Sequence, residues 1–150
     1  MPQPSQDPGL QALERFVGAW TIEAAGPDGQ PWPGTGTATF EWHPSRAHVV
    51  QTTATPGAPR SVSIMGCDPA QGTYVQLYSD DRGVCRIYDM RLDGDEWSLE
   101  RVGEPFPQRF TGAFSADGHT ISGRWEKAED GTTFTLDFFL TYRREVAWAR

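Results

Sequence analysis

The chain has 150 residues and a formal net charge of −7, with 16 glycines, 12 prolines and 12% aromatic residues. Its length fits one domain, and we expect a flexible tail over 1–9 followed by a single domain over 10–150. The acidic surplus argues against a nucleic-acid partner, because phosphate binding needs clustered lysine and arginine. No apolar run approaches the roughly 18 residues of a membrane span. The first residues show no signal segment, so we expect a cytoplasmic protein without a membrane partner.

Two cysteines, Cys67 and Cys85, fall on different predicted strands, and no Cys-x-x-Cys or His/Cys spacing lies nearby. This arrangement predicts two free thiols in a reducing compartment rather than a disulfide or a metal site. The sequence also contains no Gly-x-Ser-x-Gly, His-Glu-x-x-His or phosphate-binding loop motif. We therefore predict no metal, no cofactor and no catalytic residue.

The predicted elements form a meander. Leu10, Leu13 and Phe16 recur at helical spacing and predict a short helix over 9–16. After Gly18 the pattern changes to alternation, and the predicted strands are 20–25, 36–43, 47–55, 61–68, 73–80, 83–92, 96–102, 108–115, 120–128 and 132–144. The connectors are short and rich in Gly, Pro and Asp, as in hairpins. Closure of the sheet into an antiparallel up-and-down barrel removes its exposed edges, and a sandwich is the alternative.

Strand alternation predicts which side chains face the interior. On the second strand, Phe40 and Trp42 are expected inside. On the last strand the expected inward set is Phe134, Leu136, Phe138, Leu140 and Tyr142. Trp97 and Phe139 are expected on exposed outer faces, where they would favour a homodimer.

Gly18 and Trp20 follow the short helix as Gly-x-Trp, and the last strand ends in arginines. This arrangement resembles the calycin superfamily of lipocalins, fatty-acid-binding proteins and nitrobindins. Residues 10–144 are also similar to uncharacterised bacterial calycin-like domains, through the segments FVGAW, FEWHPSRAHVVQ, MGCDPAQGTYVQLYSDDRGVCRIYDM, RFTGAFSADGHTISGRWE and LTYRR. The resemblance implies an all-β calycin-like barrel of about ten strands with a cavity. It also implies that Trp20 plugs one end and that Arg144, or alternatively Arg143, packs over it.

The hairpin from Tyr74 to Met90 carries the main candidate site, and two strand parities are open. The first points inward the side chains of Tyr74, Gln76, Tyr78, Arg86, Tyr88 and Met90. The second instead buries Val75, Leu77, Cys85 and Ile87. A buried arginine needs an anionic partner, so the first parity predicts that Arg86 meets a ligand's charge. Fatty-acid-binding proteins resemble this arrangement, because they grip a carboxylate with Arg and Tyr.

The sequence thus predicts a protein that binds a small, mostly apolar ligand with an anionic or hydrogen-bonding end. Tyr78, Tyr88 and Gln76 would orient that end, and the remaining candidates are Tyr74, Met90, Trp42, Phe40, His48 and Phe138. One alternative is an isomerase, cyclase or hydrolase-like enzyme that uses Tyr88 or His48 as proton carrier. A second alternative is a haem-binding nitrobindin-like protein, which is disfavoured because no histidine follows His119.

Overall fold

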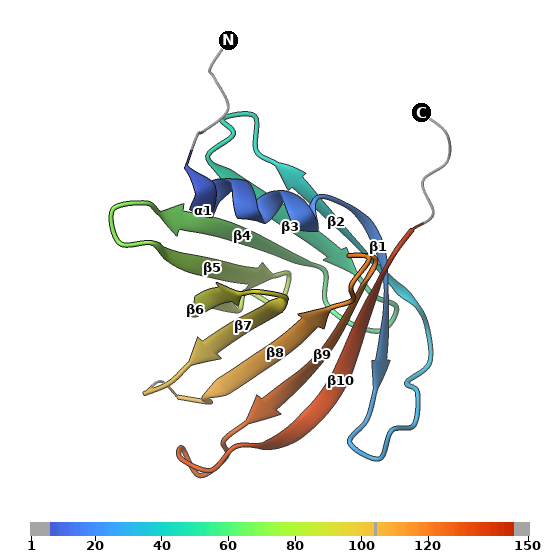
Figure 1. The fold of residues 1–150 in the computed structure, drawn as a ribbon. Helices are drawn as coiled ribbons and strands as arrows, with labels where there is room; N and C mark the ends of the chain where they lie inside the picture. The colour runs from blue at the N-terminus through green and yellow to red at the C-terminus, as the bar shows by residue number, and fades with distance from the viewer. Residues whose placement is uncertain (1–6, 104, 146–150) are drawn as a thin grey trace.

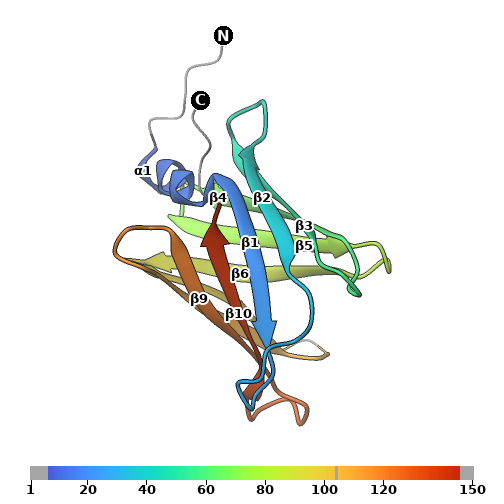
Figure 2. The same ribbon diagram turned by 90° about the vertical axis from the view of Figure 1, so that its right-hand side faces the viewer.

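The computed structural model describes residues 7–103 and 105–145, and within them ten strands form a closed antiparallel barrel (Figures 1 and 2). Each strand pairs with its neighbours in sequence, and the first pairs with the last. The strands are β1 (Gly18–Ala25), β2 (Gly36–Trp42), β3 (His48–Ala54), β4 (Ser61–Asp68), β5 (Thr73–Asp80), β6 (Cys85–Asp93), β7 (Glu96–Arg101), β8 (Gln108–Phe114), β9 (Thr120–Lys127) and β10 (Thr135–Arg144). The predicted up-and-down barrel is confirmed. No helix in the described part of the chain is long and apolar enough to cross a membrane.

A short helical segment precedes the barrel and lies across one of its ends (Figure 1). It consists of α1 (Pro8–Gln11) and the 3-10 helix η1 (Ala12–Phe16). The Asp7 carboxylate caps α1 by accepting a hydrogen bond from the Leu10 amide at 3.0 Å. The helical segment therefore begins at Pro8, before the end of the tail expected over 1–9. Residues 1–6 of that expected tail lie outside the described residues.

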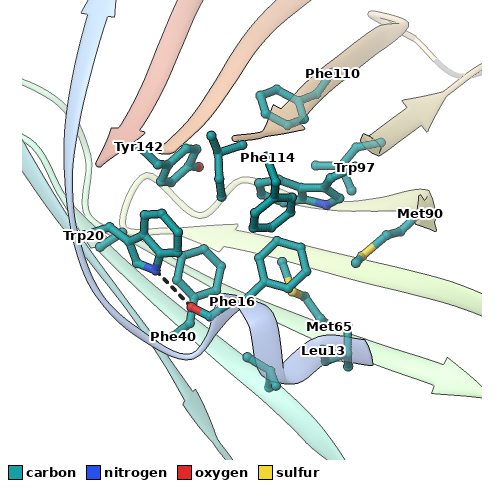
Figure 3. Packing of buried hydrophobic residues seen from close by; sticks show 14 of the residues in the cluster. Leu13, Phe16, Trp20, Phe40, Met65, Met90, Trp97, Phe110, Phe114 and Tyr142 are labelled. Carbon is teal, nitrogen blue, oxygen red and sulfur yellow. Dashed lines mark hydrogen bonds between the residues drawn. The ribbon is translucent and has the colours of Figure 1, made fainter. Parts of the chain in front are cut away.

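Trp20 closes the barrel end beneath this helical segment and is fully buried. Its indole N–H donates a hydrogen bond to the Phe16 carbonyl oxygen at 2.9 Å (Figure 3). The Arg144 guanidinium lies 4.1 Å from the centre of the Trp20 ring. It also donates to the carbonyl oxygens of Val17 and Arg15, both at 2.7 Å. One arginine thus binds the indole ring and satisfies two carbonyl groups that join the helical segment to β1.

The Gly-x-Trp pattern has a steric reason. Gly18 has φ = 137°, and a Cβ atom at this position would lie 2.6 Å from Arg144 Nη1. Only glycine fits this close approach of backbone and guanidinium. Arg143, the alternative partner of Trp20, is instead exposed and forms an ion pair with Glu23 at 3.2 Å.

The helical segment fills the adjacent half of the barrel interior. Phe16 and Leu13 are fully buried, and the Phe16 ring lies 5.5 Å from Phe40, 4.9 Å from Trp97 and 5.2 Å from Phe114 (Figure 3). Such aromatic packing adds to the burial of apolar surface. This half of the interior is a close-packed core.

Trp97 is only 1% exposed, so its expected place on an outer face is wrong. On β7 it shares the inward face with the buried Leu99, whereas Glu96 is exposed. Inward and outward side chains alternate along β7, as in any strand, and this alternation places Trp97 inside rather than in a homodimer contact. The homodimer stays a prediction that rests on Phe139, which is 36% exposed.

A β-bulge in β10 overturns part of the expected inward face. Leu136 pairs with Glu126, whereas Phe138 pairs with Trp125, so the register shifts between them. Cross-strand neighbours share a face, and Glu126 lies outside, where it forms an ion pair with an arginine of β8. Leu136 therefore faces outward. The centre of the Phe134 ring lies 4.3 Å from the guanidinium of Arg109, the arginine that pairs with Glu126, so Phe134 is also on the outer face. The expectation that Phe134 and Leu136 point inward is wrong, because the bulge reverses the alternation.

We expect the Arg144→Ala substitution to lower the free energy of unfolding by about 2–4 kcal/mol, because it leaves two carbonyl groups without their donor and removes the cation from the Trp20 ring. Urea unfolding followed by circular dichroism measures this loss. Arg143→Ala is the matched control and should cost less than about 1 kcal/mol, because its ion pair is exposed. Equal losses in the two variants would contradict the role given to Arg144.

Candidate functional site

A cavity of about 290 Å³ occupies the half of the barrel interior away from the helical segment. Trp32 of the β1–β2 connection and Ala58 and Pro59 of the β3–β4 connection belong to its lining. β1 runs away from Trp20 into the first of these connections (Figure 1). β3 runs in the same direction as β1, because both pair antiparallel with β2, so both connections lie at the barrel end opposite Trp20. The core therefore forms the floor of the cavity, and these connections surround its mouth.

One wall of the cavity is apolar and largely aromatic. The side chains come from β1 and β7–β10 together with the β1–β2 connection, and they are Ile22, Ala24, Trp32, Trp97, Leu99, Phe110, Trp125, Phe138 and Leu140. Phe110 stands between Trp97 and Trp125, with ring-centre distances of 4.8 Å and 5.2 Å. Trp32 covers Phe138 at 5.2 Å. This wall suits the flat face of an apolar or aromatic molecule.

The opposite wall is polar but uncharged. Strands β3, β4 and β5 supply Gln51, Thr53, Ser61, Ser63, Gln76 and Tyr78. The Gln51 side-chain amide donates to Thr53 Oγ1 at 3.2 Å and to the hydroxyl of Tyr142 at 3.4 Å. Burial raises the pKa of Tyr142 to about 12, so its hydroxyl is neutral at physiological pH.

At the mouth end of this polar wall, a buried carboxylate on the same inward face of β5 holds the Tyr78 hydroxyl. Tyr78 donates a hydrogen bond to Asp80 Oδ2 at 2.7 Å. The Asp80 carboxylate also accepts from the Arg82 guanidinium at 2.7 Å and from the Arg82 amide at 2.9 Å. These hydrogen bonds from Arg82 hold the pKa of Asp80 well below its usual range. Burial, together with the hydrogen bond to Asp80, raises the pKa of Tyr78 to about 12.

Two polar atoms of cavity-lining residues have no hydrogen-bond partner among the residues described. They are Gln76 Oε1, an acceptor, and Trp97 Nε1, a donor. Their side chains are strongly buried, at 5% and 1% exposure. A buried polar atom without a partner costs about 1–3 kcal/mol. Both atoms are therefore candidates to gain a partner when a molecule enters the cavity.

The Tyr74–Met90 hairpin adopts the first of the two predicted parities. Gln76 and Tyr88 are buried, whereas Val75 is 45% and Ile87 is 60% exposed. Of the ten predicted ligand residues, the cavity lining contains Gln76, Tyr78 and Phe138. The others face the interior or the barrel rim at other places.

Arg86 and Tyr88 lie beside the cavity but outside its lining. The Arg86 guanidinium and the Tyr88 hydroxyl both donate to Gln108 Oε1 at 2.8 Å. The Arg86 guanidinium also lies 5.3 Å from the Phe106 ring centre. The protein itself therefore supplies the hydrogen-bond partner that the sequence assigned to a ligand's charge.

Phe40, Met90 and Tyr74 lie at the closed end of the barrel. Phe40 and Met90 belong to the core around Phe16, with exposures of 0% and 2%. The Tyr74 hydroxyl donates to the Gly9 carbonyl oxygen at 2.6 Å, which ties the helical segment to β5. The inward alternation is right at these positions, but the space they face is filled by the helical segment.

Trp42 and His48 lie at the rim of the same closed end. The Trp42 indole donates a hydrogen bond to the Glu14 carboxylate. His48 stacks on His43 with ring centres 4.5 Å apart, and burial together with His43 lowers the pKa of His48. Within the described residues, no group of three or more His, Cys, Asp or Glu side chains is arranged to hold a metal ion.

Sequence reasoning missed Gln51 and Ser63 of the polar wall. Both are buried, at 5% and 3% exposure. A usable signal is present, because Gln51 shares its strand face with the apolar Val49, and Ser63 shares its face with Met65. A polar residue on an otherwise apolar inward face marks a place where the interior is not filled by hydrocarbon.

Comparisons with known proteins bear on the fold. No protein-family model matches the chain, and no curated protein matches it. The crystal structure of Rv2717c from M. tuberculosis is similar with a TM-score of 0.62 and 17% sequence identity, over 93% of this chain and 98% of that one. A protein with unknown function from the DUF3598 family of Nostoc punctiforme aligns over 96% of this chain and 100% of that one, with a TM-score of 0.28 and 7% identity. The likeness to Rv2717c shows a shared fold.

We expect Asp80 to make the stability of the protein depend on acid pH. Because its folded-state pKa lies below the unfolded-state value of about 4, the ionised carboxylate stabilises the fold above that pH. This contribution is lost as the pH falls toward the folded-state pKa. Urea unfolding between about pH 6 and pH 2 should show a shallower acid decline for Asp80→Asn than for the unaltered protein. The exposed Asp81→Asn variant is the control, and a decline as steep in Asp80→Asn as in this control would contradict the assignment.

Proposed function

We propose that the protein binds a small, largely apolar and uncharged molecule in the interior cavity, with the molecule's hydrogen-bonding end against β3–β5. The observation that carries this proposal is the division of the cavity into an aromatic wall and an uncharged polar wall. Ligand pockets of proteins commonly combine apolar surface with a few convergent polar groups. The cavity suits a hydrogen-bonding end better than an anionic one, because Arg86 binds Gln108 outside the lining.

The size of the cavity supports a ligand of about two rings. An apolar cavity of about 150 Å³ binds benzene, and the present cavity is about 290 Å³. Edge-to-face packing of Trp97 on Phe110 and a tilted contact of Phe110 with Trp125 leave these rings preorganised, so a flat molecule can bind without rearrangement of this wall.

We further propose that the barrel is calycin-like and works in the cytoplasm. The contact of Arg144 with Trp20 supports the calycin-like assignment, because it is the arrangement that the resemblance implies. Cys67 and Cys85 are both free thiols, which supports a reducing compartment.

Filling the cavity should weaken binding strongly. We expect Thr53→Trp to weaken binding of 1-aminonaphthalene, a neutral two-ring fluorophore, at least tenfold, because an indole at this position occupies the ligand's space. Fluorescence titration of the purified protein measures the affinity. Thr52→Trp is the matched control, since the adjacent Thr52 is exposed on the outer face and should leave the affinity unchanged. Equal affinities of the two variants, or no binding by the unaltered protein, would contradict the proposal.

A further inference from the structure

We propose that the polar wall selects molecules whose uncharged end donates a hydrogen bond, such as a hydroxyl or an aromatic N–H group, and rejects carboxylates. This inference rests on the proposed function and specifies the ligand class for the same cavity. This selectivity follows from the hydrogen bonds that the polar wall already donates to partners within the protein.

Tyr78 can only accept a hydrogen bond from the cavity. A tyrosine hydroxyl has one hydrogen atom, and in Tyr78 this atom is donated to the buried Asp80 carboxylate at 2.7 Å. The Arg82 guanidinium keeps Asp80 ionised, so the carboxylate remains an acceptor at physiological pH. The Tyr78 hydroxyl is therefore fixed in direction and can only accept a further hydrogen bond.

Gln51 and Gln76 add carbonyl oxygens to the same wall. The side-chain nitrogen of Gln51 donates to both Thr53 and Tyr142, which uses its two hydrogen atoms. Its remaining hydrogen-bonding capacity is that of an acceptor. Gln76 Oε1 is buried and accepts no hydrogen bond from any of the described residues.

These acceptors are neighbours in the sheet. Gln51 pairs with Ser63, and Ser63 pairs with Tyr78, so the three side chains form a row across β3, β4 and β5 on the inner face. Gln76 precedes Tyr78 by two residues and points to the same face. The Ser63 hydroxyl can donate or accept, so Tyr78 and Gln76 Oε1 are the groups of this wall that call for a donor from the ligand.

A carboxylate is the wrong complement for this row. It has only acceptor oxygens when ionised, and it would face the Tyr78 hydroxyl, whose hydrogen atom is already donated to Asp80. Among the described residues, no cationic side chain lines the cavity. Nothing in the lining would therefore compensate the carboxylate's loss of hydration. A neutral donor instead gives Gln76 Oε1 its missing partner while its ring lies against the aromatic wall.

The test compares four ligands with the same ring system. We expect 2-naphthol, which donates a hydrogen bond, to bind at least about tenfold more tightly than 2-methoxynaphthalene and 2-methylnaphthalene. We expect 2-naphthoate to bind most weakly of the four. Isothermal titration at neutral pH, where 2-naphthol is uncharged and 2-naphthoate is ionised, gives all four affinities on the full chain.

The Gln76→Met variant assigns the selectivity to the wall. Methionine has a similar length but no carbonyl oxygen, so the preference for 2-naphthol over 2-methoxynaphthalene should shrink several-fold while binding of 2-methylnaphthalene persists. That persistence also shows that the variant is folded. Gln71→Met, in the exposed β4–β5 turn, is the control and should keep the full preference.

The possible outcomes separate this inference from the proposed function. If the neutral ligands bind equally, if 2-naphthoate binds most tightly, or if Gln76→Met keeps the full preference, the inferred donor selectivity is overturned while cavity binding stands. If none of the four ligands binds to the unaltered protein, the proposed function fails, and the selectivity fails with it.

Discussion

The contact between Arg144 and Trp20 determines how the interior of this barrel is used. The indole N–H and the carbonyl groups of Arg15 and Val17 leave water on folding, and each finds a partner only because the helical segment and the last strand meet at this end. With the helical segment held there, Phe16 enters the barrel and fills its nearer half with a close-packed core. The cavity exists only in the remaining half.

The open half differs from the core in the size and polarity of its side chains. On β3 and β4 the inner face changes from Val49 and Met65 near the helical segment to Thr53 and Ser61 near the mouth. The small and polar side chains of this wall do not reach across the interior to the large aromatic side chains of the opposite wall. The two walls therefore remain apart, and the buried Asp80 at the mouth end of the polar wall holds the Tyr78 hydroxyl in place. This combination supports the proposed binding of a neutral, partly aromatic molecule.

Local sequence pattern predicts the strands and most of their inward faces, because a period of two and turn residues are properties of short segments. It does not predict how deep in the barrel an inward residue lies. Phe40 and Phe138 are both inward, yet the first packs against the helical segment and the second lines the cavity. The bulge before Phe138 cannot be predicted from the sequence either, because one extra residue in a strand does not change its composition. Arg86 found its partner in Gln108, a pairing that depends on two strands not adjacent in the sheet.

The most direct test of the account is an NMR titration of the ¹⁵N-labelled protein with 2-naphthol, observed at the six tryptophan indole N–H groups. A ligand in the cavity should shift the indole signals of Trp97 and Trp125, which line it, and should leave those of Trp20 and Trp42 at the closed end nearly unchanged. Shifts confined to Trp20 and Trp42, or no shift at saturating 2-naphthol, would contradict the account.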